Sequence, residues 1–262
     1  MGMASMAIER LERLAALPDD AEAREAAIRR QSSKNTLGLI GGLVGAVVGL
    51  QPVLSLGLME GGLTALALLS MLGVLLGMWA GDFVALRRIA GQGDVRVAAL
   101  QRRTLTDYLT RLELVAQGWA TLTAVYTLLV GVVAVNLGGG DRRIGVSMLV
   151  CGGAGLLLCS VAPVLQRRVL RASRPALSES ALRWDEAERA QMLRDVTIGV
   201  ALTAWMLGGA FLGQQIFDLS DRLPVALRWA ALPLIVIGYV LSLWAVYAQK
   251  DAKTWQRLRE RA

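Results

Sequence analysis

Residues 36–50 read TLGLIGGLVGAVVGL, and residues 62–81 read GLTALALLSMLGVLLGMWAG. Both runs are free of charged residues and rich in Leu, Val, Ala and Gly. About 20 apolar residues are enough for a helix to cross the roughly 30 Å hydrocarbon core of a bilayer. The two runs, joined by a short segment, therefore predict a transmembrane helical hairpin.

The same arrangement recurs twice more along the chain, at a period of about 80 residues, and such periods indicate a repeated structural unit. We therefore expect an all-α integral membrane protein with six transmembrane helices, arranged as three helical hairpins. An amphipathic helical arm on the cytosolic side precedes each hairpin. The first helices of the hairpins begin near Thr36, Gly118 and Val196, and the second helices near Gly62, Ile144 and Pro224.

The composition agrees with this interpretation. Of the 262 residues 55% are hydrophobic, whereas about 45–50% is usual in soluble proteins. Six spans take nearly half of the chain and leave no stretch for a separate catalytic domain, so we expect one membrane domain overall. Its parts are an N-terminal arm (1–35), the first hairpin (36–90), the second arm and hairpin (91–172), and the third arm and hairpin with a basic C-terminal tail (173–262).

The positive charge lies on one side of the predicted hairpins. Residues 1–35, 82–117, 166–195 and 249–262 together hold 24 of the 28 Lys and Arg residues. Basic residues accumulate on the cytoplasmic side of membrane proteins, so both termini are predicted to be cytoplasmic in a multi-pass protein of the inner membrane. The bias accounts for the net charge of +7 without nucleic acid, and it predicts attraction to anionic lipids.

The arms have recognisable helix signals. In the first arm Ile8, Leu11, Leu14 and Leu17 recur every three residues, which indicates a helix with an apolar stripe. Pro18-Asp19-Asp20 then interrupts the helix and restarts it with Asp as the N-cap. We expect the restarted helix to end near residues 32–35, and the second and third arms to continue into their spans without a break. Three uses of the arms stay open: they lie on lipid headgroups, pack together as a cytosolic bundle, or bind a partner.

Small residues recur at every fourth position within the spans. Such rows stay near one helix face and let two backbones approach closely. They predict helix packing within the subunit; the alternatives are a seam between copies of the protein, or helices that line a pore. The rows consist of Gly41, Gly45 and Gly49 in the first span, Gly73, Gly77 and Gly81 in the second, and Cys151, Gly155 and Cys159 in the fourth.

Polar residues are rare within the spans. Thr123, Thr127, Gln214 and Gln215 are the candidates for a pore lining or for hydrogen bonds between helices. Thr hydroxyls in such helices commonly bond to their own backbone, which is the alternative role of both Thr residues. Aromatic residues favour the membrane interfaces, and the predicted anchors are Trp79, Trp119, Trp229, Trp244 and Tyr247.

The absence of certain residues and motifs from the sequence excludes several classes of function. The chain has no His, which excludes His-ligated metals and His-based acid–base catalysis, and it carries no motif of a nucleotide-binding loop or a hydrolase. We therefore expect no cofactor and no enzymatic activity. Two hypotheses remain: a non-catalytic membrane subunit that docks other membrane proteins, further copies of itself or lipids through its basic arms, or a channel for ions or small solutes. The Ala-, Leu- and Arg-rich composition is typical of bacteria.

Overall fold

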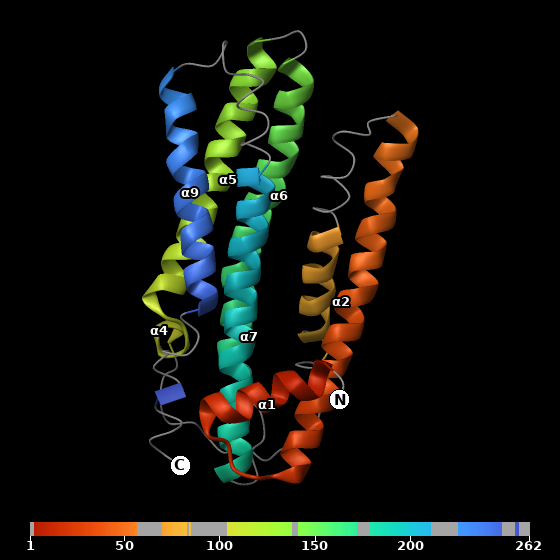
Figure 1. The fold of residues 1–262 in the computed structure, drawn as a ribbon, viewed down its shortest axis with the longest axis vertical. Coiled ribbons are helices and arrows are strands. Elements are labelled where there is room, and N and C mark those ends of the chain that lie inside the picture. The colour runs from red at the N-terminus through yellow and green to blue at the C-terminus, as the bar shows by residue number, and fades with distance from the viewer. Residues whose placement is uncertain are drawn as a thin grey trace. The chain divides into compact units, whose positions relative to one another are not determined.

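The structure, a computed structural model, describes residues 3–56, 70–82, 84, 104–137, 141–171, 179–210, 225–247, 255 and 256. Apart from residues 16–20, 104, 109 and 110, these ranges are helical, and they contain no β-strand (Figure 1), which confirms the all-α class for this part of the chain. Besides helical residues 70–82, the longer helices are α1 (Met3–Ala15), α2 (Ala21–Leu56), α5 (Arg111–Leu137), α6 (Asp141–Arg171), α7 (Glu179–Trp205) and α9 (Val225–Tyr247).

The chain forms two compact units. Unit 1 comprises Met1–Leu109, Gln166–Leu193 and Lys250–Ala262, and unit 2 comprises Thr110–Leu165 and Arg194–Gln249. Unit 1 therefore contains residues from all of the predicted arms, together with the first predicted hairpin. Unit 2 contains the residues of the other two predicted hairpins.

The first arm packs within unit 1. Ile8, Leu11 and Ala15 of α1 are buried, and α1 lies against α2, as Figure 1 shows. The apolar stripe of α1 is thus covered by protein. Trp255, near the C-terminus, is fully buried in the same unit. Of the three uses considered for the arms, the packed bundle agrees with these contacts.

Helix α2 differs from the expectation. It runs without interruption from Ala21 to Leu56, so the expected end near residues 32–35 is wrong and the first arm continues into the first apolar run. Ser and Asn are weak helix formers, but side-chain hydrogen bonds within the helix accompany this stretch: Thr36 Oγ1 donates to the backbone carbonyl of Ser32 (3.0 Å), and Gln31 Nε2 donates to Asn35 Oδ1 (3.1 Å).

The second arm shows the opposite difference. The short helix α4 (Leu105–Tyr108) ends at Leu109, whose backbone is extended, and α5 begins at Arg111. A continuous helix through this arm was expected, and the break has a clear cause. Thr110 and Glu113 form a capping box, in which the Thr110 amide donates to Glu113 Oε2 (2.6 Å) and the Glu113 amide donates to Thr110 Oγ1 (3.2 Å).

The third arm agrees with the prediction of one long helix. Helix α7 runs through Val196, the expected start of the fifth span, to Trp205. The five-residue π-helix η1 (Met206–Ala210) follows it directly. Single π turns are rare and widen the helix locally.

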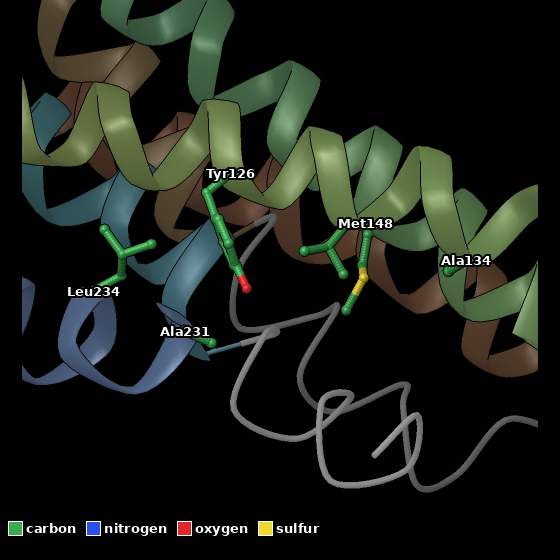
Figure 2. Packing of buried hydrophobic residues seen from close by; sticks show 6 residues of the cluster. Tyr126, Ala134, Met148, Ala231 and Leu234 are labelled. Atoms are coloured by element: carbon green, nitrogen blue, oxygen red, sulfur yellow. The ribbon is translucent and has the colours of Figure 1, made fainter. Parts of the chain in front are cut away.

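Unit 2 is built on the pair α5–α6. A Cβ on Gly131 would lie 3.0 Å from Gly145 O, and one on Gly152 would lie 2.8 Å from Leu128 N, so the two helices run antiparallel in close contact. Helix α9 packs on α5. The core between them contains Tyr126, Val130, Ala134, Met148, Ala231 and Leu234; Figure 2 shows the Tyr126 ring directed toward the helix that carries Ala231 and Leu234.

The outward face of α5 is apolar. Ala120, Ala124, Val130 and Ala134 are buried on the inner face, whereas a regular stripe of larger residues is exposed. From its second member on, the stripe repeats at steps of three, four and three residues, and its first member lies seven residues earlier, which keeps the stripe on one helix face. It consists of Val115, Leu122, Val125, Leu129 and Val132.

Two described helices are long and apolar enough to cross a membrane: Arg111–Asn136 in α5 and Ile144–Arg171 in α6. Trp229–Leu241 in α9 is a shorter apolar stretch. Two such helices suggest a membrane location only weakly, because core helices of soluble proteins pass the same test. Among the described residues, helix length and hydropathy therefore do not show the six predicted spans.

Candidate functional site

The most concentrated polar contacts lie on the N-terminal half of α7, within unit 1. Six residues, which we call the arm junction, make these contacts. Ser180, Trp184 and Glu188 follow one another at four-residue steps and share a helix face, and Asp185 and Arg189 bond to each other. The arm junction consists of Ser180, Trp184, Asp185, Glu186, Glu188 and Arg189.

The first arm meets the junction at three points. Ser180 Oγ donates to Asp20 Oδ2 (2.8 Å), and Trp184 Nε1 donates to Pro18 O (3.3 Å). Arg30 of α2 forms an ion pair with Glu188, whose carboxylate is largely buried. The turn between α1 and α2 and the first part of α2 are thereby attached to α7.

Asp20 has a second role in the same turn. Its Oδ1 accepts a hydrogen bond from the Ala23 amide (3.0 Å), which makes Asp20 the predicted N-cap of α2. The Ala23 amide, and next the Ser180 hydroxyl, hold the pKa of Asp20 below its ordinary value of 3.8. The charged form of Asp20 therefore stabilises both the helix start and its contact with α7.

The second arm contributes Tyr108 of α4, which is buried and donates its hydroxyl to Glu186 Oε2 (2.6 Å). The α4 segment is positioned by its own capping box, in which the Thr104 amide donates to Asp107 Oδ2 (2.9 Å). Contacts from the first and second arms thus converge on the third arm.

Arg189 connects the junction to the end of α6. Its side chain is 1% exposed. Nη1 donates to the carbonyl oxygens of Val169 (2.6 Å) and Leu170 (3.3 Å), and Nη2 donates to Asp185 Oδ2 (2.9 Å). The last carbonyls of a helix lack backbone partners, so the guanidinium satisfies two of them while Asp185 balances its charge.

A second ion pair lies deeper along α2. Lys34 Nζ lies 3.1 Å from Asp82 Oδ2, and both side chains are nearly buried. Beside the pair, a Cβ on Gly81 would lie 2.9 Å from the Cα of Lys34. The pairing of Asp82 with Lys34 joins the end of helical residues 70–82 to α2.

Unit 2 holds the most deeply buried ion pair among the described residues. Glu113 of α5 is 0% exposed and Arg194 of α7 is 1% exposed, with 3.3 Å between Oε1 and Nε. Thr110 donates its hydroxyl to the other carboxylate oxygen of Glu113 (2.9 Å). Burial lowers the pKa of Arg194, and the Glu113 and Asp195 carboxylates oppose that effect. A buried pair of this kind is costly to break from one side.

Two tryptophans attach α9 within the same unit. Trp119 Nε1 donates to Leu234 O (3.0 Å), and Trp205 Nε1 donates to Ile235 O (3.2 Å). Both indoles lie over Gly238, where a Cβ would overlap the Trp205 ring and lie 3.3 Å from Cδ1 of Trp119. Trp119, predicted as an interface anchor, and Trp205 therefore bind the same helix.

The glycines of the first predicted hairpin lie in contact. A Cβ on Gly41 would collide with Gly73 O, and one on Gly73 with Gly41 O; a Cβ on Gly77 would collide with Leu37 O. Gly45 contributes its Cα near Gly73. The environment of Gly49 lies outside the described residues.

The predicted row of small residues in the fourth span makes side-chain contacts rather than close backbone contacts. A Cβ on Gly155 would lie 3.3 Å from the Ala124 Cβ, a tight contact, and 3.7 Å from the Ala204 Cα, an ordinary packing distance. Cys159 is buried, Cys151 is partly exposed, and both are free thiols. The small residues here admit α5 and α7 without the backbone contact seen at Gly41.

The two candidate threonines are fully buried in unit 2. Thr123 Oγ1 donates to Trp119 O (3.0 Å) and Thr127 Oγ1 to Thr123 O (2.8 Å), so both hydroxyls bond to their own helix. Gln214 and Gln215, the other candidates for a pore lining, lie outside the described residues.

The remaining predicted anchors differ in exposure. Trp79 is buried in unit 1, whereas Trp229 and Trp244 are exposed on α9. Their separation of 15 residues corresponds to about 22 Å along the helix. Tyr247 ends α9, but its side chain is not among those described.

The ion pairs of Glu113, Arg189 and Arg194 were not predicted from the sequence. One signal was available: Thr110-Arg111-Leu112-Glu113 has the pattern of a capping box. The i, i+4 spacing of Asp185 and Arg189 allows a pair but does not indicate burial, since most such pairs are solvent-exposed.

Within the described ranges no group of three or more Cys, Asp or Glu side chains could hold a metal ion. The geometry is that of charged and aromatic contacts between helices. Comparison with protein-family models, with curated proteins and with solved structures found no match.

Proposed function

We propose that this chain is a non-catalytic, multi-pass subunit of a bacterial inner membrane. In this proposal six helices cross the bilayer as three hairpins, and both termini are cytoplasmic. The arms form an ordered cytosolic body that docks other membrane proteins, further copies of the chain, or anionic lipids.

The exposed apolar side chains support the membrane location. In the most apolar 18-residue stretch of α5, only 44% is buried within the protein. In the corresponding stretch of α6, 33% is buried. A core helix of a soluble protein would be mostly buried, and large contiguous apolar patches are rare on soluble surfaces. Lipid tails would cover the stripes of both helices.

The arm junction is the observation that carries the docking function. The carboxylates of α7 bind Arg30 and Tyr108 from the other arms, and Trp184 is buried among them. The arms thus have a defined structure stabilised by specific contacts, which is more than a solubilising connection requires. A scaffold needs such a preformed surface, because ordering the arms on binding would reduce affinity.

A channel remains the alternative function. Thr123 and Thr127 support it poorly, because their hydroxyls bond to helix carbonyls and are not exposed. The π-helix η1 favours it, since π turns often mark functional positions. Ion flux through liposomes that contain the purified protein alone would decide for the channel.

Native mass spectrometry of the protein, extracted in mild detergent from its own membranes, tests the proposal. We expect a stable assembly with other membrane proteins. Arg30→Gln removes the ion pair with Glu188 and should weaken the assembly, whereas Arg29→Gln removes only the exposed pair with Glu25 on the same helix. A monomer or homo-oligomer that conducts ions would contradict the scaffold, and extraction by alkaline carbonate would contradict the membrane location.

A further inference from the structure

The C-terminal end of α6 combines an exposed apolar stripe with exposed arginines. Along one helix face, Val146, Val150, Leu157, Val161 and Val164 are exposed. Gly153 continues this face, and a Cβ there would meet nothing within 4 Å. Residues at steps of three and four stay on one side of a helix.

The apolar part of this stripe has the length of a bilayer core. From Val146 to Val164 a helix rises about 27 Å at 1.5 Å per residue, against roughly 30 Å for the hydrocarbon layer. Arg167, Arg168 and Arg171 follow within the next two turns and are exposed. They are placed along the helix where the headgroups of one leaflet would begin.

The arginines are not needed to complete the helix end. Arg189 already donates to the carbonyl oxygens of Val169 and Leu170, two of the last acceptors of α6. The sequence also provides no nearby carboxylate, since residues 142–178 contain six arginines and neither Asp nor Glu. Arg167 and Arg171 thus present their charge outward, with no acidic neighbour in sequence.

We propose that the C-terminal end of α6 is a binding site for an anionic phospholipid. Arg167 and Arg171 bind the phosphate, because guanidinium groups match phosphate oxygens in charge and geometry. The acyl chains lie along Val164, Val161 and Leu157. The inference deepens the proposed function by locating its lipid partner, and it rests on the membrane location of α6.

The test uses the full chain in nanodiscs of phosphatidylcholine with a small fraction of phosphatidylglycerol. Native mass spectrometry measures how strongly phosphatidylglycerol is retained over phosphatidylcholine. A basic residue near the headgroups contributes about a fivefold preference, so Arg167→Gln/Arg171→Gln should reduce the preference by roughly 25-fold. Arg168 is left in place, because it has an interaction within the protein.

Two variants control for charge. Arg13→Gln/Arg29→Gln removes the same net charge from exposed positions on α1 and α2 and should leave the preference unchanged. Arg167→Lys/Arg171→Lys keeps the charge and should retain most of it. The site would be overturned if Arg13→Gln/Arg29→Gln lost as much preference for phosphatidylglycerol as Arg167→Gln/Arg171→Gln. It would also be overturned if Arg167→Gln/Arg171→Gln lost none.

A measurement with free phosphate distinguishes binding of a lipid headgroup from binding of a soluble anion. Inorganic phosphate should not raise the melting temperature of the wild type in phosphatidylcholine nanodiscs, whereas phosphatidylglycerol should; stabilisation by phosphate alone would overturn the lipid assignment. Extraction of the protein by alkaline carbonate would show that the proposed membrane location has failed. An integral protein without lipid preference would show that the site alone has failed.

Discussion

The indole ring of Trp205 fills the space above Gly238, where any other residue would place its Cβ. The ring also donates to Ile235 O and lies 5.8 Å from the Tyr239 ring, centroid to centroid. The absence of a side chain at one position of α9 therefore lets α7 bind the backbone of that helix directly.

Gly238→Ala should destabilise unit 2. The added methyl would overlap the Trp205 ring, and overpacking of this kind costs about 1–3 kcal/mol. Gly118→Ala on α5 is the matched control, because a Cβ there meets nothing within 4 Å and Ala favours the helix. Thermal unfolding in detergent should show a lower melting temperature for Gly238→Ala only; equal melting temperatures would show that the indole has room to move.

Gly41→Ala should separate α2 from helical residues 70–82. Its Cβ would collide with the Gly73 carbonyl, and backbone cannot rotate away as a side chain can. Gly45→Leu and Gly77→Leu should likewise disrupt folding or assembly, whereas Gly153→Ala, at an open position, should be tolerated. Wild-type yield and melting temperature for the first three variants would show that the close approach is not required.

The Glu113–Arg194 pair should behave as a coupled unit. Glu113→Leu alone leaves a buried guanidinium without its carboxylate, which costs about 3–5 kcal/mol. The double variant Glu113→Leu/Arg194→Met removes both charges and should recover much of that loss. A double-mutant cycle on the free energy of unfolding measures the coupling; additive effects would mean that the pair is not energetically linked.

Asp20 should make stability depend on pH in the acid range. Because its pKa is held below 3.8 in the folded protein, its contribution is complete above that value and is lost as the pH falls through the folded pKa. The difference in melting temperature between wild type and Asp20→Asn should shrink as the pH is lowered from 6 to 3.

Asp19→Asn is the control for Asp20→Asn, since Asp19 is the exposed neighbour in the same turn. Its difference from wild type should be small at every pH. A constant difference for Asp20→Asn over the same range would contradict the role of the charged carboxylate as cap and partner of Ser180.

The sequence predicted what depends on local chemistry. The helical class, an Asp N-cap directly after Pro18 and the continuity of α7 follow from periodicity and capping preferences. The Thr hydroxyl bonds within α5 also follow from local geometry. These features need no knowledge of which segments meet.

The errors have a common physical origin. Ser32 and Asn35 suggested a helix end, because both have low helix propensity. Propensity alone does not include the hydrogen bonds that the Ser32 carbonyl and the Asn35 side chain accept inside α2. The break before α5 was missed, because the apolar spacing around Thr110 masked its capping box with Glu113. The buried positions of Arg189 and Arg194 depend on contacts between helices that no local pattern specifies.

The unbroken course of α2 has a mechanical consequence. Its 36 residues extend about 54 Å, some 24 Å more than a hydrocarbon layer of about 30 Å. If the apolar part lies in the bilayer as proposed, a change of tilt there is not absorbed at a hinge and must displace the Asp20 end. Helix tilt depends on bilayer thickness. A change in thickness would therefore move the Asp20 end of α2 and act on the Asp20–Ser180 contact.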